Sequence, residues 1–266
     1  MQNRIIASFL RRGGGLTNAG GLSYASGLSR KSAFTLAEVL ITLGIIGVVA
    51  AMTLPGLIQN YQKSVVENQL KVVYSLITNA FKFAEAEYGT GFDFLPNEWK
   101  NENTPNGYNF EFSEAVFETY LKEHFKVTQS YSKTESINQF KYNNNISLTG
   151  SPKCYKLANG MGLCFIASGN IESTAYFYIF LKPNSKHKVA GRDVFNFTVR
   201  KKNKGSYFGY QMMSEIYDEN NRPQYIQGCA NKTETYPVGI YDAPFICTML
   251  FWENNMKFPE DYPIKF

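Results

Sequence analysis

An uncharged apolar run near the N-terminus constrains this 266-residue chain more than any other feature. The run extends over 20 residues from Val39 to Ile58, and Glu38 is the only charged residue between Lys31 and Lys63. Such a run is long enough to cross the hydrocarbon core of a bilayer as a helix. A core helix of a globular protein normally has a polar face, which this run lacks. The run therefore predicts a transmembrane helix over residues 34–58.

Charge is distributed very unevenly along the chain. Residues 1–33 contain five bases and no acid, and the rest of the chain holds 22 bases and 22 acids, so the net charge of +5 belongs to the N-terminal segment. Basic residues mark the cytoplasmic side of a membrane span. We therefore expect residues 1–33 in the cytoplasm, a single pass through the cytoplasmic membrane, and the C-terminal part outside. Because that part is neutral, no nucleic-acid partner is expected.

An ordinary secretory signal is the alternative interpretation of the apolar run. Its cleavage site would follow the run, and Val49-Ala50-Ala51 has the small residues that such a site needs. The run continues past these residues into a second helical pattern, which favours a retained membrane helix. Residues 13–29 are rich in glycine and other small residues, which predicts a flexible segment.

A glutamate at the start of this run requires an explanation, because a carboxylate in a bilayer is costly unless it is paired or lies near the headgroups. Residues 32–40 read SAFTLAEVL. This segment closely resembles the prepilin cleavage and methylation site of type IV pilins and of the pseudopilins of type II secretion systems. The resemblance implies that a prepilin peptidase cuts between Ala33 and Phe34 and methylates the new N-terminus. Residues 1–33 would then be a cytoplasmic prepilin leader.

The same resemblance assigns roles to two more residues. Glu38 matches the glutamate that neutralises the terminal amine of a neighbouring subunit as a filament grows, and Pro55 falls where many pilins carry a helix-kinking proline. The implied partners are other pilin-like subunits, the inner-membrane assembly machinery and the membrane itself. The implied destination is a periplasmic pseudopilus or a surface pilus. Two features depart from the family's pattern: Ala33 stands where glycine is usual, and the 33-residue leader is long.

After Pro55 the pattern becomes amphipathic. Apolar residues at steps of mostly three or four predict a helix over 59–88 whose apolar face packs on a globular head formed by residues 89–266. The apolar positions are Leu57, Ile58, Tyr61, Val65, Leu70, Val73, Leu76, Ile77, Ala80, Phe81 and Ala84. The expected fold is α+β and type IV pilin-like, with a long N-terminal helix packed on a small antiparallel sheet. A membrane anchor followed by an unrelated helix stays open as an alternative.

Four strands are predicted in the head. Segments 153–157 and 161–167 flank Ala158-Asn159-Gly160, which suits a three-residue hairpin loop with Gly160 left-handed. Segments 174–181 and 194–200 follow, the last with the alternation of a half-buried strand. We also expect a helix over 114–124 capped by Ser113, a surface excursion over 128–151, and a short apolar helix or strand over 247–252.

The hairpin register places Cys154 opposite Cys164, close enough for a disulfide. Four cysteines allow three pairings, and we favour Cys154 with Cys164 and Cys229 with Cys247, since a compartment outside the cytoplasm permits disulfides. Zinc is disfavoured because there is no CxxC pair, and unpaired buried thiols remain an alternative.

Two further segments resemble a subgroup of bacterial prepilin-type proteins. They are residues 191–195 (GRDVF) and residues 247–263 (CTMLFWENNMKFPEDYP). These similarities extend the resemblance over most of the chain.

No catalytic or cofactor motif is found in the sequence. It has no HExxH, no phosphate-binding glycine loop and no GxSxG, and its two histidines, His124 and His187, are expected at the surface. Calcium could be considered at Asp218 with Glu219 or at Asp193 with Asp242, but none of these forms an Asp-rich ligand loop. We therefore expect neither an enzyme nor a bound cofactor.

These observations favour a prepilin-like filament subunit, specifically a pseudopilin of a type II secretion-like system. Two alternatives remain. One is a minor type IV pilin with a role in adhesion or DNA uptake. The other is a single-pass anchored extracytoplasmic module that forms no filament, in which Phe34 would stay uncut.

Overall fold

The computed structural model describes residues 34–88, 110–143, 146–148, 150–168, 174–200, 219–230 and 242–266. The predicted leader, the cleavage position Ala33 and the calcium candidate Asp218 lie outside these residues. The described residues divide into two units, with the boundary between Ala50 and Ala51 of α1.

Helix α1 (Leu36–Tyr88) is 53 residues long and begins as an exposed apolar segment. An 18-residue window within it has a mean hydropathy of 2.2, and none of that window is buried. Among the described residues, α1 alone is long and apolar enough to cross a membrane. The helix continues through Pro55, whose ring nitrogen cannot donate the usual bond to the carbonyl four residues earlier.

In the second unit, α1 packs against the head along one face. The buried residues recur at three- or four-residue steps and so share that face: Leu70, Val73, Ile77, Ala80, Phe81 and Ala84. The predicted packing face is confirmed at these positions. It is wrong at the four earlier ones, because the side chains of Leu57, Ile58, Tyr61 and Val65 are exposed.

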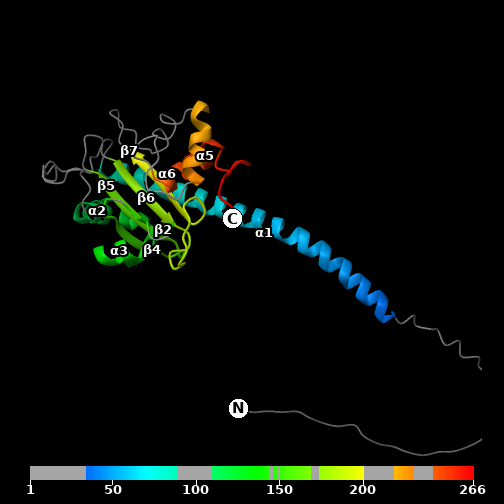
Figure 1. The fold of residues 1–266 in the computed structure, drawn as a ribbon. Helices are drawn as coiled ribbons and strands as arrows, with labels where there is room; N and C mark the ends of the chain where they lie inside the picture. The colour runs from blue at the N-terminus through cyan, green and yellow to red at the C-terminus, as the bar shows by residue number, and fades with distance from the viewer. Residues whose placement is uncertain are drawn as a thin grey trace, which may run out of the picture. The chain divides into compact units, whose positions relative to one another are not determined.

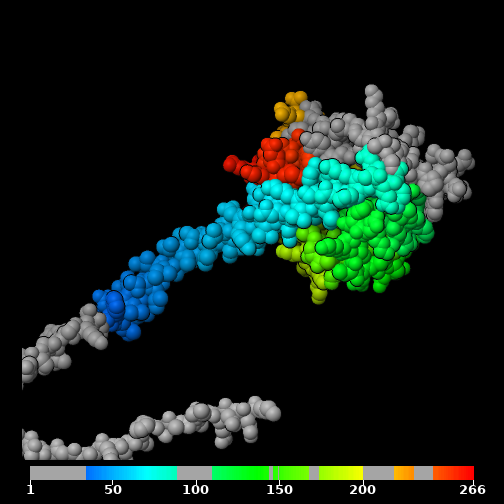
Figure 2. All heavy atoms as spheres, turned by 180° about the vertical axis from the view of Figure 1, so that it is seen from behind, coloured from blue at the N-terminus to red at the C-terminus, as the bar shows by residue number. Residues whose placement is uncertain are grey.

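The C-terminal tail contacts α1 close to where the buried face begins. The carboxylate of Glu67 accepts a hydrogen bond from the backbone N–H of Phe258 at 2.8 Å. Figure 2 shows the red C-terminal residues lying against the cyan part of α1. The periodicity of the sequence therefore predicted correctly which face of α1 is apolar. How much of that face is buried depends on where the C-terminal tail and the sheet contact α1.

A five-stranded antiparallel sheet forms the centre of the head (Figure 1), with the strand order β1-β4-β5-β6-β7. Its strands are β1 (Val127–Ser130), β4 (Lys153–Leu157), β5 (Gly162–Ser168), β6 (Thr174–Phe180) and β7 (Val194–Arg200). The four predicted strands are confirmed. The β4–β5 hairpin turns at Gly160, whose φ of +83° suits glycine, and it pairs Cys154 with Cys164 as the register predicted.

The sheet separates two apolar clusters, because side chains alternate along each strand. Tyr155, Phe165, Phe177 and Phe195 come from four neighbouring strands and pack in one cluster with the buried face of α1. Cys154, Cys164, Tyr178 and Val194 point into the other cluster, which is covered by residues of the segment 131–148.

That covering segment corrects the prediction of a surface excursion over residues 128–151. It follows β1 and contains helix α3 (Lys133–Gln139) and a small hairpin of β2 (Lys141–Tyr142) and β3 (Ile146–Ser147). Phe140 is fully buried and packs edge-on against Phe180, with ring centroids 5.1 Å apart. The prediction failed because the buried anchors Tyr131, Phe140 and Leu148 are spaced too irregularly among polar residues to form a periodic pattern.

The helix predicted to begin after Ser113 already includes Ser113. Helix α2 (Phe110–Val116) leads into a π-helical turn, η2 (Phe117–Leu121), and a 3₁₀ turn, η3 (Lys122–His124). The Ser113 hydroxyl is buried and accepts a hydrogen bond from the backbone N–H of Ala167 in β5 at 3.1 Å. The Ser113 hydroxyl therefore serves as the acceptor for a backbone N–H of β5 and does not cap a helix.

Strand β7 is buried on both faces, whereas its alternation predicted one exposed face. Helix α6 (Ala243–Glu253) packs beside it, and Thr248 Oγ1 accepts a hydrogen bond from the backbone N–H of Asn196 at 3.0 Å. The short turn η4 (Glu219–Asn221) and helix α5 (Arg222–Ala230) complete this side of the head. Residues 247–252 are thus helical, one of the two predicted forms.

Candidate functional site

The candidate assembly site lies at the first turn of α1. Thr35 and Glu38 form a Thr-x-x-Glu capping box, in which each residue satisfies a backbone donor of the other. The Glu38 Oε2 atom accepts hydrogen bonds from the backbone N–H of Thr35 at 2.8 Å and from its hydroxyl at 2.9 Å. The Thr35 hydroxyl in turn accepts from the backbone N–H of Glu38 at 3.2 Å. The local sequence thus folds so that the carboxylate is held at the start of the helix.

This carboxylate can receive a further cation. Both of its bonds from Thr35 use Oε2, and the side chain of Glu38 is exposed. The positive end of the helix dipole also favours an anionic side chain at this position. The second oxygen, Oε1, can therefore accept a hydrogen bond from a donor outside residues 34–88.

The apolar surface around the carboxylate is extensive. Phe34 is 84% exposed, and the following residues expose their side chains on all sides of the helix. They include Leu36, Leu40, Ile41, Leu43, Ile45, Ile46, Val48, Val49, Met52 and Leu54. A single carboxylate on an otherwise apolar helical segment needs either a lipid–water boundary or a partner of opposite charge.

Both favoured disulfides are present in the head. Cys154 is bonded to Cys164 across β4 and β5, and Cys229 of α5 is bonded to Cys247 of α6. The first bond lies in the cluster opposite α1, and the second joins two neighbouring helices. They stabilise the head and place no free thiol among the described residues.

Residues 191–195 and 247–263, the two further segments that resemble a subgroup of prepilin-type proteins, contact each other in the folded head. Gly191 has a φ of +78°, and a Cβ atom there would lie 2.6 Å from both Cys247 Sγ and the Tyr262 hydroxyl. That hydroxyl donates a hydrogen bond to the Gly191 carbonyl at 2.7 Å. The positive φ and the close packing around Gly191 therefore explain why residues 191–195 (GRDVF) begin with glycine, and no ligand-binding role is needed.

The calcium candidates are used in other ways. The Asp193 carboxylate accepts hydrogen bonds from the Val189 N–H and the Arg192 guanidinium. Asp242 caps α6 by accepting from the Phe245 N–H at 3.0 Å, and it accepts from the Tyr178 hydroxyl at 2.6 Å. Burial raises the pKa of the Asp242 carboxyl, and these hydrogen bonds oppose that rise. Neither residue stands in an oxygen-rich loop of the kind that calcium requires.

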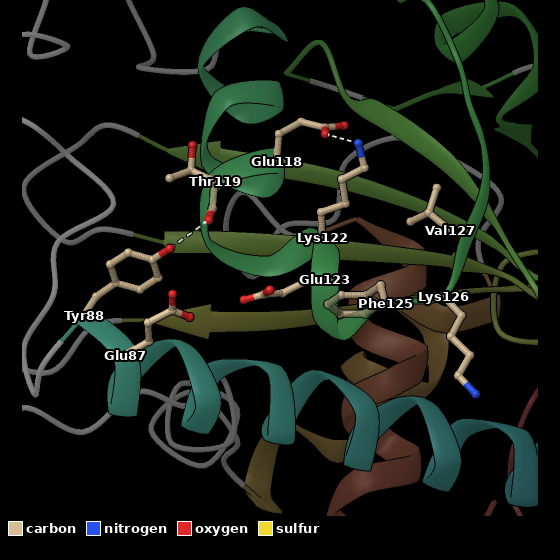
Figure 3. Close-up of a pocket in the computed structure, with 9 residues that line it drawn as sticks. All are labelled: Glu87, Tyr88, Glu118, Thr119, Lys122, Glu123, Phe125, Lys126 and Val127. Atoms are coloured by element: carbon tan, nitrogen blue, oxygen red, sulfur yellow. Dashed lines mark hydrogen bonds and ion pairs between the residues drawn. The ribbon is translucent and has the colours of Figure 1, made fainter.

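The one His/Cys/Asp/Glu group among the described residues that could hold a metal ion lies elsewhere, at Glu87, Glu123 and His124. Glu87 and Glu123 line a pocket of about 540 Å³ between the end of α1 and the turns η2 and η3 (Figure 3). Sequence reasoning missed this group, because Glu87 is 36 residues from Glu123 and no motif links them. His124 is also less exposed than expected for a surface residue, with 18% of its side chain accessible.

Comparison with known families identifies the class and then the family. The profile described as the prokaryotic N-terminal methylation motif matches residues 28–54. An exposed apolar N-terminal helix with that motif, followed by an α+β head, defines a prepilin-type protein with a type IV pilin-like fold. A second profile, described as a family of unknown function (DUF6613), matches residues 56–266, and the chain belongs to this family. No curated protein and no solved structure matches the chain.

Proposed function

We propose that this chain is a filament subunit, specifically a pseudopilin of a type II secretion-like system, and that it acts by assembly and not by catalysis. The observation that carries the proposal is a single carboxylate, Glu38, presented on the exposed and otherwise uncharged apolar segment of α1 that ends before Lys63. The methylation motif over residues 28–54 implies processing by a prepilin peptidase. Cleavage between Ala33 and Phe34 then creates a charged amine four residues before Glu38.

Charge pairing sets the order of assembly in this proposal. The N-methylated amine of one Phe34 enters an apolar helical bundle and pairs with Glu38 of a neighbouring subunit. Removing one partner of a buried ion pair costs about 3–5 kcal/mol, because the other charge stays buried and unpaired. A subunit docked in the wrong register leaves both charges unpaired, so the pair selects the correct register.

Apolar helix packing then holds the filament together. The side chains of residues 34–58 exchange lipid for neighbouring helices, which gains little hydrophobic free energy because both surroundings are apolar. The inner-membrane assembly machinery must therefore supply the energy of extraction. The head, stabilised by two disulfides, faces the space outside the cytoplasm.

N-terminal sequencing and intact mass of the protein from native membranes test the processing step. A chain that begins at N-methylated Phe34 is expected. A start at Met1 would leave an anchored module and overturn the filament mechanism, and a start just after Ala51 would identify an ordinary secretory signal. Release by shearing from the cell surface would favour a surface pilus, whereas retention in the periplasm is expected for a pseudopilus.

The substitution Glu38→Gln tests the assembly step, because it keeps an acceptor for Thr35 and removes the charge. We expect a processed subunit that stays in the membrane fraction and enters no filament. Glu135→Gln is the matched control, since Glu135 forms the same capping box with Ser132 in the head, where Oε2 accepts from the Ser132 N–H and hydroxyl at 2.8 Å. Normal filaments from Glu38→Gln, or equal loss from both variants, would refute the role of the charge.

A further inference from the structure

The C-terminal end of α1 and the turn η3 bring three potential metal ligands together. Glu87 belongs to the last turn of α1, and Glu123 and His124 are consecutive residues of η3. One ligand atom from each lies within 4.8 Å of the other two, and His124 Nε2 is 3.7 Å from Glu123 Oε1. Figure 3 shows the carboxylates of Glu87 and Glu123 directed toward each other across the gap between the two elements.

The imidazole of His124 contributes an observation that is independent of the acidic pair. Its Nε2 atom is inaccessible to solvent and has no hydrogen-bond partner in the part of the chain that the structure describes. A buried polar atom without a partner costs about 1–3 kcal/mol, so native structures seldom contain one without a reason. A metal ion bound between Nε2 and the two carboxylates would satisfy this nitrogen.

The ring is also held in place to act as a ligand. Phe83 stacks on His124, with ring centroids 5.3 Å apart and planes 24° apart. Phe83 and Glu87 are four residues apart on α1 and share one face of the helix. The face of α1 that orients the imidazole therefore also presents Glu87 to the imidazole nitrogen.

The surrounding charges leave the group acidic. Lys122 forms an ion pair with Glu118, and the Lys126 side chain extends away from Glu123 in Figure 3. Glu87 lies at the C-terminal end of α1, where the helix dipole favours a cation. Tyr88, the next residue, donates a hydrogen bond from its hydroxyl to the Thr119 carbonyl at 3.2 Å, and its phenol also interacts with the carboxylates of Glu87 and Glu123.

We propose that Glu87, Glu123 and His124 bind a divalent transition-metal ion, with zinc as the best match. Imidazole together with carboxylates suits zinc, copper or nickel, whereas calcium takes oxygen ligands. Ligands of a tetrahedral zinc ion at 2.0–2.1 Å lie about 3.4 Å from one another. Because the three ligand atoms lie within 4.8 Å of one another, the side chains need to close by up to about 1.4 Å. Three protein ligands leave the fourth position for water.

The bound ion would fasten the end of α1 to the head. It joins the last turn of the helix to η3 by coordination, in addition to the apolar packing of the helix on the sheet. This site is separate from the processing and assembly residues, so it goes beyond the proposed function and does not depend on it.

Titration of the full-length chain in detergent with Zn²⁺, followed by calorimetry, tests the proposal. We expect one ion per chain and a rise in the melting temperature on binding. Even an outer-shell substitution costs roughly 10–100-fold in metal affinity, so His124→Gln, Glu123→Gln and Glu87→Gln should each weaken binding at least ~10-fold. Circular dichroism of each variant without metal checks that it is folded.

The chain offers a matched control, because His187 is its only other histidine. His187→Gln should bind Zn²⁺ as the unchanged chain does. Because the spectrum contains only two histidine side chains, ring-proton NMR shows directly which imidazole responds to Zn²⁺. Absence of stoichiometric binding, a response of His187 instead of His124, or unchanged affinity in Glu87→Gln and His124→Gln would each overturn the proposal.

Discussion

Three glycines of the head allow backbone strain and close packing to be measured separately. Gly160 and Gly191 both have positive φ, +83° and +78°, but only Gly191 is crowded. A Cβ atom at Gly160 meets nothing within 4 Å, whereas one at Gly191 meets Cys247 Sγ and the Tyr262 hydroxyl at 2.6 Å. Gly162 is the converse case: its φ is ordinary, and a Cβ atom would lie 2.5 Å from Cε1 of the buried Phe140.

The structure sets the expected order of destabilisation. Left-handed backbone in a residue with a Cβ costs roughly 1–2 kcal/mol, so Gly160→Ala should lower the free energy of unfolding by about that amount. Overpacking in a well-packed core costs about 1–3 kcal/mol, which is the loss expected for Gly162→Ala. Gly191→Ala combines both effects and disturbs the hydrogen bond from Tyr262, so its expected loss is about 2–5 kcal/mol.

Denaturant unfolding of the three variants, in detergent and with the disulfides intact, measures these losses. The slope of free energy against denaturant should be unchanged, so that midpoint shifts report stability alone. The reasoning would be refuted if Gly160→Ala destabilised the protein as much as Gly191→Ala, since the contacts of Cys247 and Tyr262 would then contribute nothing.

Three further predictions concern the head. Ser113→Ala should cost about 1–3 kcal/mol in a denaturant midpoint assay, because it leaves the buried N–H of Ala167 without its acceptor; an unchanged midpoint would contradict this assignment. Burial raises the pKa of Asp242, so the folded state holds more protons than the unfolded state above the usual aspartate value of about 3.9, and stability should fall as pH rises through the folded pKa. Asp242→Asn should remove that slope in unfolding curves measured at several pH values, and a slope that persists would mean that another group causes it. The cysteines of the two disulfides are 10 and 18 residues apart in sequence. Replacing each pair with serines should therefore lower the free energy of unfolding by about 2.7 kcal/mol for Cys154–Cys164 and about 3.2 kcal/mol for Cys229–Cys247, from loop entropy alone. If thermal unfolding gave losses that differ between the two pairs by far more than ~1 kcal/mol, packing and not loop entropy would dominate.

Local patterns were sufficient to predict much of this protein. The apolar run with one carboxylate predicted the exposed start of α1, because the length and hydropathy of a membrane helix are properties of consecutive residues. The β4–β5 hairpin and the Cys154–Cys164 bond followed from a three-residue loop ending in Gly160. The prepilin-type motif lies within a single short segment, so it too could be found without the fold.

Other features depend on contacts between distant segments. Burial of both faces of β7 requires α6, which begins more than 40 residues later in the chain, and the true start of the packing face on α1 depends on where the C-terminal tail contacts it. Ser113 had the sequence context of a helix cap, but the fold placed it against an open donor of β5. The group of Glu87, Glu123 and His124 forms only when the end of α1 packs against η3. Periodicity and short motifs describe neighbours along the chain, whereas these sites depend on neighbours in space, which chain folding alone brings together.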